Sequence, residues 1–157
     1  SRLLQQPGGH WERQRAIAAL ADTLPDERGI YMFVWKPDLV FKLDGPPQSM
    51  HLHWILYVGK AGIEQGLSDT VKSRYRSDYR RYVEGDVAQL WGADAATSRH
   101  EKLSRYLCLR PLEFWFLLLD DPREIARLEP KLISTLNPPL NSRPGPRLRP
   151  GRTTAAF

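Results

Sequence analysis

The sequence predicts an α/β fold in which helices flank a small β-sheet. Short apolar runs rich in β-branched and aromatic residues have the composition of buried strands, and they cover residues 30–35, 53–58 and 113–119. Two segments begin with strong helix-start signals, a capping box at Ser98 and an N-cap at Asp121 that is followed by proline. At 157 residues, the chain suits one domain that buries a core without disulfides.

The first part of the chain is predicted to form an amphipathic helix over residues 10–23. Apolar residues recur there near helical spacing, at Trp11, Ala16, Ile17, Leu20 and Ala21. A turn at residues 25–29 then leads into the first strand. We therefore interpret residues 1–23 as an N-terminal extension ahead of the main domain.

An insertion separates the first strand from the second. Turn residues stand at both of its ends, and residues 39–43 alternate well enough between them to form an extra strand. The second strand run, at residues 53–62, ends abruptly in tyrosine, glycine and lysine. A glycine at that place lets the backbone approach a substrate closely.

A basic helix is predicted over residues 67–83. Val71, Tyr75, Tyr79 and Tyr82 recur at intervals of three and four residues, so they should form a buried stripe. Basic side chains occupy other faces of this helix, at Lys72, Arg74, Arg76, Arg80 and Arg81. They indicate either a nucleic-acid contact or an ordinary solvated face.

The second half of the domain should consist of a helix, a central strand and a last helix. The helix from Ser98 runs to about residue 109, and the apolar run at 113–119 is predicted to be a strand covered on both faces. The helix that starts after Asp121 contains Pro130, which removes a backbone donor. We expect a kink there or two short helices.

Charge is distributed unevenly along the chain. The formal net charge is +5, and four arginines with no acidic residue lie in residues 142–157, which are rich in proline and glycine. That segment should be an extended, disordered basic tail. A single cysteine, Cys108, excludes a disulfide framework, and no signal-peptide or membrane-spanning run is present, so a cytoplasmic protein is expected. His51, His53 and His100 are interpreted as structural or solvent-facing.

Four motifs in order along residues 24–141 resemble the GIY-YIG nuclease family. The first two are Gly29-Ile30-Tyr31 and Tyr57-Val58-Gly59, and Lys60 directly follows the second. Downstream, Glu129-Pro130-Lys131-Leu132-Ile133 is similar to the family's Glu-x-x-Leu-Ile segment, and Asn137-Pro138-Pro139-Leu140-Asn141 is similar to its closing Pro-x-x-Asn. The resemblance implies a mostly antiparallel sheet flanked by helices, in the manner of a GIY-YIG sandwich.

The resemblance also implies a catalytic site. Glu129 would hold one Mg²⁺ or Mn²⁺ ion, and Arg74 would clamp the scissile phosphate, with Arg76 as the alternative clamp. Lys60 would stabilise charge or lower the pKa of a tyrosine. Tyr31 is favoured as the base that activates water, with Tyr57 as its partner, and because Asp78 replaces the family's usual His or Tyr, Tyr79 is assigned a third polar role.

These assignments predict a metal-dependent DNA endonuclease, most similar to restriction or defence enzymes because of the insertion and the N-terminal helix. Double-stranded DNA would be the partner, bound by Lys72, Arg76, Arg80, Arg81 and Asn141. Two other functions stay open: the nuclease domain of a repair protein, and an inactive nucleic-acid-binding module of the same fold. The chain could also form a homodimer or belong to a larger parent protein. The insertion would serve DNA binding or dimerisation, or be a plain surface excursion.

Overall fold

The computed structural model describes residues 9–41, 44–63, 68–92, 96 and 98–141. They form a four-stranded antiparallel sheet with the strand order β1-β6-β2-β5, and a separate two-stranded hairpin. The sheet strands are β1 (Glu12–Arg15), β2 (Gly29–Trp35), β5 (Trp54–Ala61) and β6 (Leu112–Leu118). The predicted class, a small antiparallel sheet flanked by helices, is confirmed. The basic tail lies outside the described residues.

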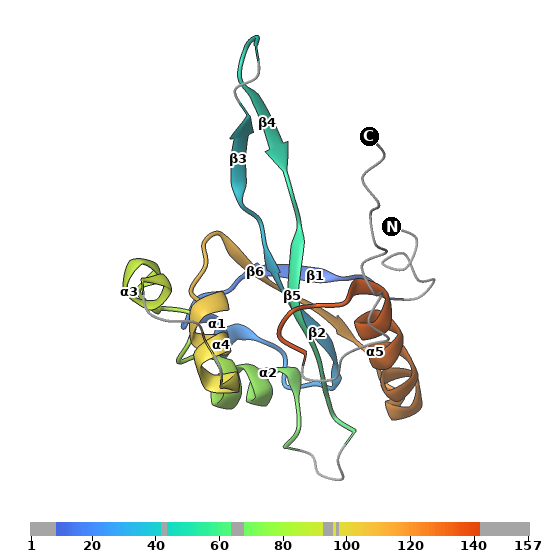
Figure 1. Cartoon of the computed structure of the whole chain (residues 1–157). Coiled ribbons are helices and arrows are strands. Elements are labelled where there is room, and N and C mark those ends of the chain that lie inside the picture. Colours follow the sequence, from blue (N-terminus) through green and yellow to red (C-terminus); the bar gives the residue numbers. More distant parts are fainter. Residues whose placement is uncertain (1–8, 42–43, 64–67, 93–95, 97, 142–157) are drawn as a thin grey trace.

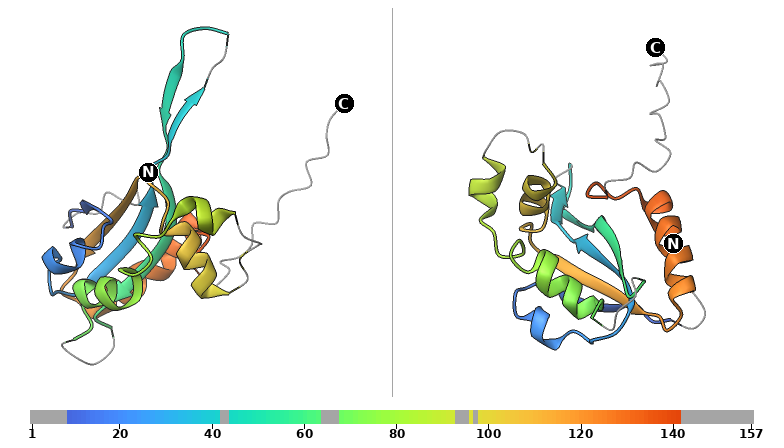
Figure 2. Two further views of the ribbon diagram at one scale, coloured as in Figure 1. Left: turned by 90° about the vertical axis from the view of Figure 1, so that its left-hand side faces the viewer. Right: turned by 90° about the horizontal axis from the view of Figure 1, so that it is seen from below.

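Helices cover both faces of this sheet (Figures 1 and 2). One face is covered by α5 (Pro122–Leu136), and the other by α2 (Val71–Arg74), its continuation the π-helix η2 (Tyr75–Tyr79), and α4 (Arg99–Tyr106). The two short helices α1 (Leu20–Thr23) and α3 (Val87–Trp91) complete the fold. The sheet therefore lies between two apolar cores.

Successive side chains along each strand point to opposite faces of the sheet, so each strand contributes to both cores. In β2, Tyr31 and Phe33 belong to the core beneath α2 and η2, whereas Ile30, Met32 and Val34 belong to the core beneath α5. The predicted stripe of the basic helix is confirmed, because all four of its members are buried: Val71, Tyr75, Tyr79 and Tyr82. Burying each side chain of this size contributes about 1.5–3 kcal/mol of transfer free energy.

Residues 10–23 do not form the predicted amphipathic helix. Residues Glu12–Arg15 pair antiparallel with β6, and only Leu20–Thr23 is helical. Ala16, Leu20 and Ala21 are buried in the core of the domain, so this segment is part of the sheet and its packing. The apolar residues had helical spacing, but hydrogen bonding to the edge of β6 determines the conformation.

The basic helix is also shorter than predicted, and α5 is longer. The basic helix spans Val71 to Tyr79 and changes from α to π geometry at Tyr75, where the Arg80 amide donates to the Tyr75 carbonyl over 2.9 Å. Conversely, α5 continues through Pro130 as one helix, so the expected division into two short helices is wrong, whereas the alternative of a kink at Pro130 stays a prediction. Its predicted N-cap is confirmed, with the Asp121 side chain accepting from the Arg123 amide.

The insertion forms a β-hairpin of β3 (Asp38–Phe41) and β4 (Gln48–His51), which confirms the extra strand over the described residues. The hairpin projects away from the sheet (Figure 1). Its side chains Val40 and Met50 are exposed, at 63% and 47%. Its expected part in DNA binding or dimerisation stays a prediction.

A β-bulge in β5 determines which side chains face α4. Phe33 pairs with Tyr57 and Val34 with Ile55, so Leu56 is the extra residue of the bulge. As a result, Leu56 and Tyr57 both join the core beneath α2 and η2, while Ile55 and Val58 join the opposite core. Beyond the bulge, normal alternation resumes.

Candidate active site

Three tyrosines from three elements meet on the α2 and η2 face of the sheet. The ring centroids of Tyr31 and Tyr57 lie 6.3 Å apart, and Tyr79 of η2 lies 5.8 Å from the first and 5.6 Å from the second. The hydroxyls of Tyr31 and Tyr79 are hydrogen-bonded over 3.1 Å. The two tyrosines of the sequence motifs are thus brought together, and so is Tyr79, to which a third polar role was assigned.

Gly59 is required where the phenol of Tyr31 crosses β5. A Cβ atom on Gly59 would lie 2.5 Å from Cζ and 2.6 Å from the hydroxyl of Tyr31. Tyr31 itself is only 2% exposed, and its ring packs against those of Tyr79 and Phe114. The glycine of the second motif therefore makes space for the tyrosine of the first.

The environment of Tyr31 does not lower its pKa, contrary to the role of base given to it from the sequence. Burial, followed by interaction with Tyr57, raises the pKa of Tyr31 well above its ordinary value. Tyr79 behaves likewise, since burial raises its pKa. Tyr57 is only partly buried. It is the tyrosine of the pair that reaches solvent.

Lys60 and Glu129 form an ion pair on the opposite face of the sheet. Lys60 Nζ lies 3.0 Å from Glu129 Oε2, and the two side chains are 40% and 15% exposed. Alternation in β5 after the bulge directs Lys60 away from Tyr57 and toward α5, which carries Glu129. Lys60 is thus engaged with a carboxylate, and it is not placed against the hydroxyl of Tyr31.

Of the two candidate phosphate clamps, Arg74 is the one beside the tyrosines. Its guanidinium contacts Asp69 through Nε at 2.6 Å and lies 3.6 Å from Asp78, and it interacts electrostatically with Tyr31. The hydrogen bond to Asp69 raises the pKa of Arg74. Arg76 instead points toward α1, where it contacts Asp22 and the carbonyl of Ala21.

Asp69 connects Arg74 to the end of β5. Its Oδ2 accepts from the amide of Gly62 over 2.9 Å, at a glycine with a φ of 91°. Burial alone would raise the pKa of Asp69, but hydrogen bonds from Arg74 and Gly62 outweigh this and lower the pKa. Three contacts therefore converge on residues 59–62: Tyr31 on Gly59, Glu129 on Lys60, and the Asp69–Arg74 pair on Gly62.

We expect Asp69→Asn to destabilise the protein by about 1 kcal/mol at pH 7, because the pair is partly exposed and solvent screens it. The folded-state pKa is depressed, so this stabilisation is present above the unfolded pKa of about 3.9 and is lost as pH falls through the folded value. Urea unfolding of both proteins should therefore show a difference at pH 7 that shrinks toward pH 2. A difference independent of pH would contradict the assignment.

A polar cleft beside the tyrosines contains residues that the motifs did not identify. It has a volume of about 430 Å³, and its lining includes Tyr79, Arg81, Arg99 and His100. The Arg99 guanidinium lies 5.5 Å from the ring centroid of Tyr57. Burial lowers the pKa of Arg99, but a hydrogen bond with Tyr57 and attraction to the tyrosines outweigh it and raise the pKa.

Only a weak signal in the sequence could have identified Arg99. It directly follows Ser98 in the capping box, which is confirmed at the start of α4, but this pattern establishes only where the helix begins. His100 was interpreted as structural or solvent-facing, and its Nδ1 is hydrogen-bonded to the Tyr82 hydroxyl over 2.9 Å. Helix α4 thus directs Arg99 at Tyr57 and His100 at Tyr82.

The predicted DNA-binding residues differ in their exposure to solvent and in their hydrogen-bond partners. Arg80 and Arg81 are exposed, and Arg81 donates to the Tyr82 hydroxyl over 2.8 Å, whereas Lys72 is partly buried. Both functional atoms of the Asn141 amide bind the backbone of Val58, over 3.0 Å and 2.8 Å. Asn141 thereby closes the exposed edge of β5, so it acts as a structural residue in this arrangement.

Glu129 is the carboxylate to which the sequence assigned a metal ion. Among the described residues, no three His, Cys, Asp or Glu side chains gather as a metal site. Glu129 offers hard oxygen ligands, and Mg²⁺ commonly binds through one or two carboxylates while keeping water and phosphate ligands. The donor chemistry of Glu129 therefore fits such an ion, with water and substrate completing its coordination.

Comparison with protein-family models gives no match, and no curated protein or solved structure matches the chain. Within the described part of the chain, no helix is long and apolar enough to cross a membrane.

Proposed function

We propose that this chain is a metal-dependent DNA endonuclease of the GIY-YIG type. The observation that carries the proposal is that side chains distant in the sequence contact residues 59–62, Tyr31 from one face of the sheet and Glu129 from the other. Tyr31 lies against Gly59, Glu129 contacts Lys60, and Asp69 joins Arg74 to the amide of Gly62. Four of these side chains, those of Tyr31, Lys60, Arg74 and Glu129, are ones that the sequence analysis assigned to the site.

The arrangement supplies the groups that phosphodiester hydrolysis needs. A water attacks phosphorus, its proton passes to a base, and the bond to the leaving oxygen breaks while negative charge develops. Arg74, which interacts with Tyr31, and Arg99, beside Tyr57, are the cations that would stabilise that charge. A Mg²⁺ ion at Glu129 would supply further positive charge for the phosphate oxygens.

Tyr57 is the better candidate for contact with the attacking water. It is the partly exposed member of the tyrosine pair, and the Arg99 guanidinium lies 5.5 Å from its ring centroid. Tyr31 would then be a positioning residue that acts through Tyr79 and Tyr57. This reverses the roles expected from the sequence.

We expect Tyr57→Phe to lower the cleavage rate on the order of 10² or more, because it removes the group that contacts the water. Tyr31→Phe should instead cost about 1 kcal/mol of stability, since it removes the hydrogen bond to the Tyr79 hydroxyl, and should change the rate by less than about tenfold. Single-turnover cleavage and urea unfolding of both variants measure the two effects. An inactive Tyr31→Phe with an active Tyr57→Phe would reinstate the original roles.

An inactive nucleic-acid-binding module of the same fold is the alternative. Its supporting observation is that Lys60 and Arg74 are each engaged with a carboxylate, and that Tyr31 is buried. Plasmid cleavage with Mg²⁺ separates the two functions. The choice of a restriction or defence enzyme over a repair domain now depends on the projecting hairpin alone, because β1 and the short helix α1 stand in place of the predicted helix over residues 10–23.

A further inference from the structure

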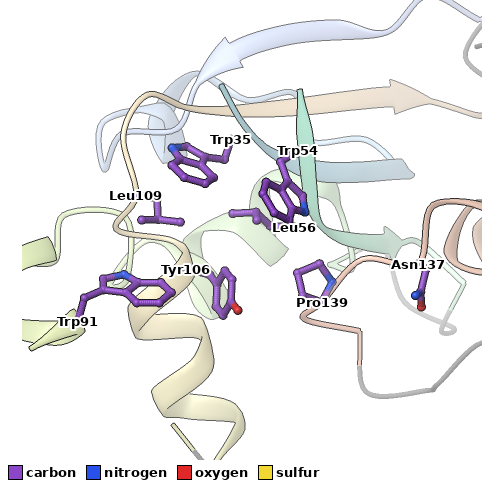
Figure 3. A pocket seen from close by; sticks show the side chains of 8 residues that line it. All are labelled: Trp35, Trp54, Leu56, Trp91, Tyr106, Leu109, Asn137 and Pro139. Atoms are coloured by element: carbon purple, nitrogen blue, oxygen red, sulfur yellow. The ribbon is translucent and has the colours of Figure 1, made fainter. Parts of the chain in front are cut away.

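An aromatic pocket adjoins the tyrosine cluster on the same face of the sheet. It encloses about 520 Å³, and Figure 3 shows Trp35 and Trp54 on one side and Trp91 and Tyr106 on the other, with Leu56 and Leu109 between them. A volume of this size is within the range of small-molecule sites. Trp54 and Trp91 remain 54% and 44% exposed, an unusual state for such large apolar side chains.

The walls of this pocket are held in place. The indole of Trp91 donates to the carbonyl of Arg105 over 2.8 Å, and that of Trp35 donates to the carbonyl of Arg110 over 3.1 Å. Trp35 stacks with Trp54 at 6.1 Å and 28°, and Trp91 meets the edge of Tyr106 at 5.4 Å. Fixed aromatic faces that remain open to solvent form a preorganised platform for a planar ligand.

The bulge in β5 joins this pocket to the proposed active site. Because Leu56 is the extra residue, Leu56 and Tyr57 face the same side, one lining the pocket and the next belonging to the tyrosine cluster. Helix α4 also connects the polar cleft with the aromatic pocket. Its first residues, Arg99 and His100, line the polar cleft, and Tyr106, about 9 Å further along the helix axis, lines the pocket.

We propose that the pocket receives an unpaired base of the DNA strand that the active site cleaves. This rests on the proposed nuclease function and adds a substrate class, DNA with a single-stranded or extruded nucleotide. The planar aromatic walls suit the faces of any base, and cations lie near the pocket. Arg99 lines the polar cleft at the start of α4, and the Arg110 guanidinium donates to the carbonyl of the lining residue Leu109 over 3.1 Å.

Binding in EDTA tests this without cleavage. Fluorescence anisotropy would compare three labelled DNAs of equal length: a single strand, a paired duplex, and a duplex with one unpaired central nucleotide. We expect Trp91→Ala and Trp54→Ala each to weaken binding of the single strand and the unpaired duplex by about 5- to 150-fold, the range for one stacked base. Binding of the paired duplex should change by less than about threefold.

Two controls separate stacking from other effects. Val87→Ala alters an exposed apolar residue on the same short helix as Trp91, outside the pocket lining, and should change nothing. Trp91→Phe keeps an aromatic face and should recover most of the affinity lost in Trp91→Ala. Thermal unfolding checks that each variant is folded, and Trp91 is the decisive site if Trp54→Ala proves unstable.

Several results would overturn the inference. Equal losses on all three DNAs, or no loss on any, would show that the pocket does not take an unpaired base. A nucleoside monophosphate that binds as tightly as the strand would identify a free nucleotide as the ligand. A dimer in light scattering that Trp91→Ala dissociates would make the pocket a contact between chains. Lack of cleavage together with tryptophan-dependent strand binding would contradict only the nuclease proposal.

Discussion

Glu129→Gln should reduce DNA cleavage on the order of 10³ or more while the protein stays folded. The substitution keeps the shape of the side chain but removes the one carboxylate that we assign to the metal ion, and with it the charge stabilisation that the ion would provide. It also breaks the ion pair with Lys60, which is partly exposed, so the free energy of unfolding should fall by no more than about 1 kcal/mol. Single-turnover cleavage with Mg²⁺ and urea unfolding measure the two effects.

Glu124→Gln is the matched control for this substitution. Glu124 is an exposed acidic residue in the first turn of the same helix, so its replacement should alter stability by a few tenths of a kcal/mol and leave cleavage unchanged. If Glu129→Gln cleaves DNA within about threefold of the unmodified protein, Glu129 is not the metal ligand.

Gly59→Ala should impair both folding and cleavage, although it adds a single methyl group. The new Cβ would overlap the ring and hydroxyl of Tyr31, which is enclosed by Tyr79 and Phe114 and cannot move away freely. Overpacking of this kind costs about 1–3 kcal/mol. Displacement of Tyr31 would also disturb Tyr57, so we expect the cleavage rate to fall on the order of 10² even in the fraction that remains folded.

Gly92→Ala controls for the exchange of glycine for alanine. Gly92 follows α3 with a φ of −77° that alanine adopts readily, and a Cβ there would lie 3.0 Å from the carbonyl oxygen of Ala88, so only a small adjustment is needed. Its stability should change by less than about 1 kcal/mol. A Gly59→Ala protein as stable and as active as Gly92→Ala would show that the close approach of Tyr31 to β5 is not needed.

The strands and the last helix could be predicted because their signals are local. The apolar runs of β2, β5 and β6 are short, β-rich and bounded by turn residues, and α5 begins with a capping aspartate and a proline. The N-terminal strand could not be predicted. Residues Glu12–Arg15 are all exposed and polar, so only their hydrogen bonds to β6 make them a strand.

The candidate site was predictable in its residues but not in its geometry. The motifs identified Tyr31, Tyr57, Lys60 and Glu129, yet the face of the sheet that each one occupies depends on a bulge at Leu56 that no local pattern marks. The same holds for Arg99, which reaches Tyr57 because of how α4 packs. Burial of Tyr31, which reverses the expected direction of its pKa, is likewise a property of the assembled core.

Cleavage of supercoiled plasmid and of single-stranded DNA, with Mg²⁺ or Mn²⁺ and with EDTA, tests the central claim most directly. A nuclease centred on residues 59–62 should nick or linearise DNA with the metal, stop in EDTA, and lose its activity in Glu129→Gln but keep it in Glu124→Gln. A folded protein that cleaves neither DNA with either metal, or whose cleavage persists in EDTA and in Glu129→Gln, would contradict the account.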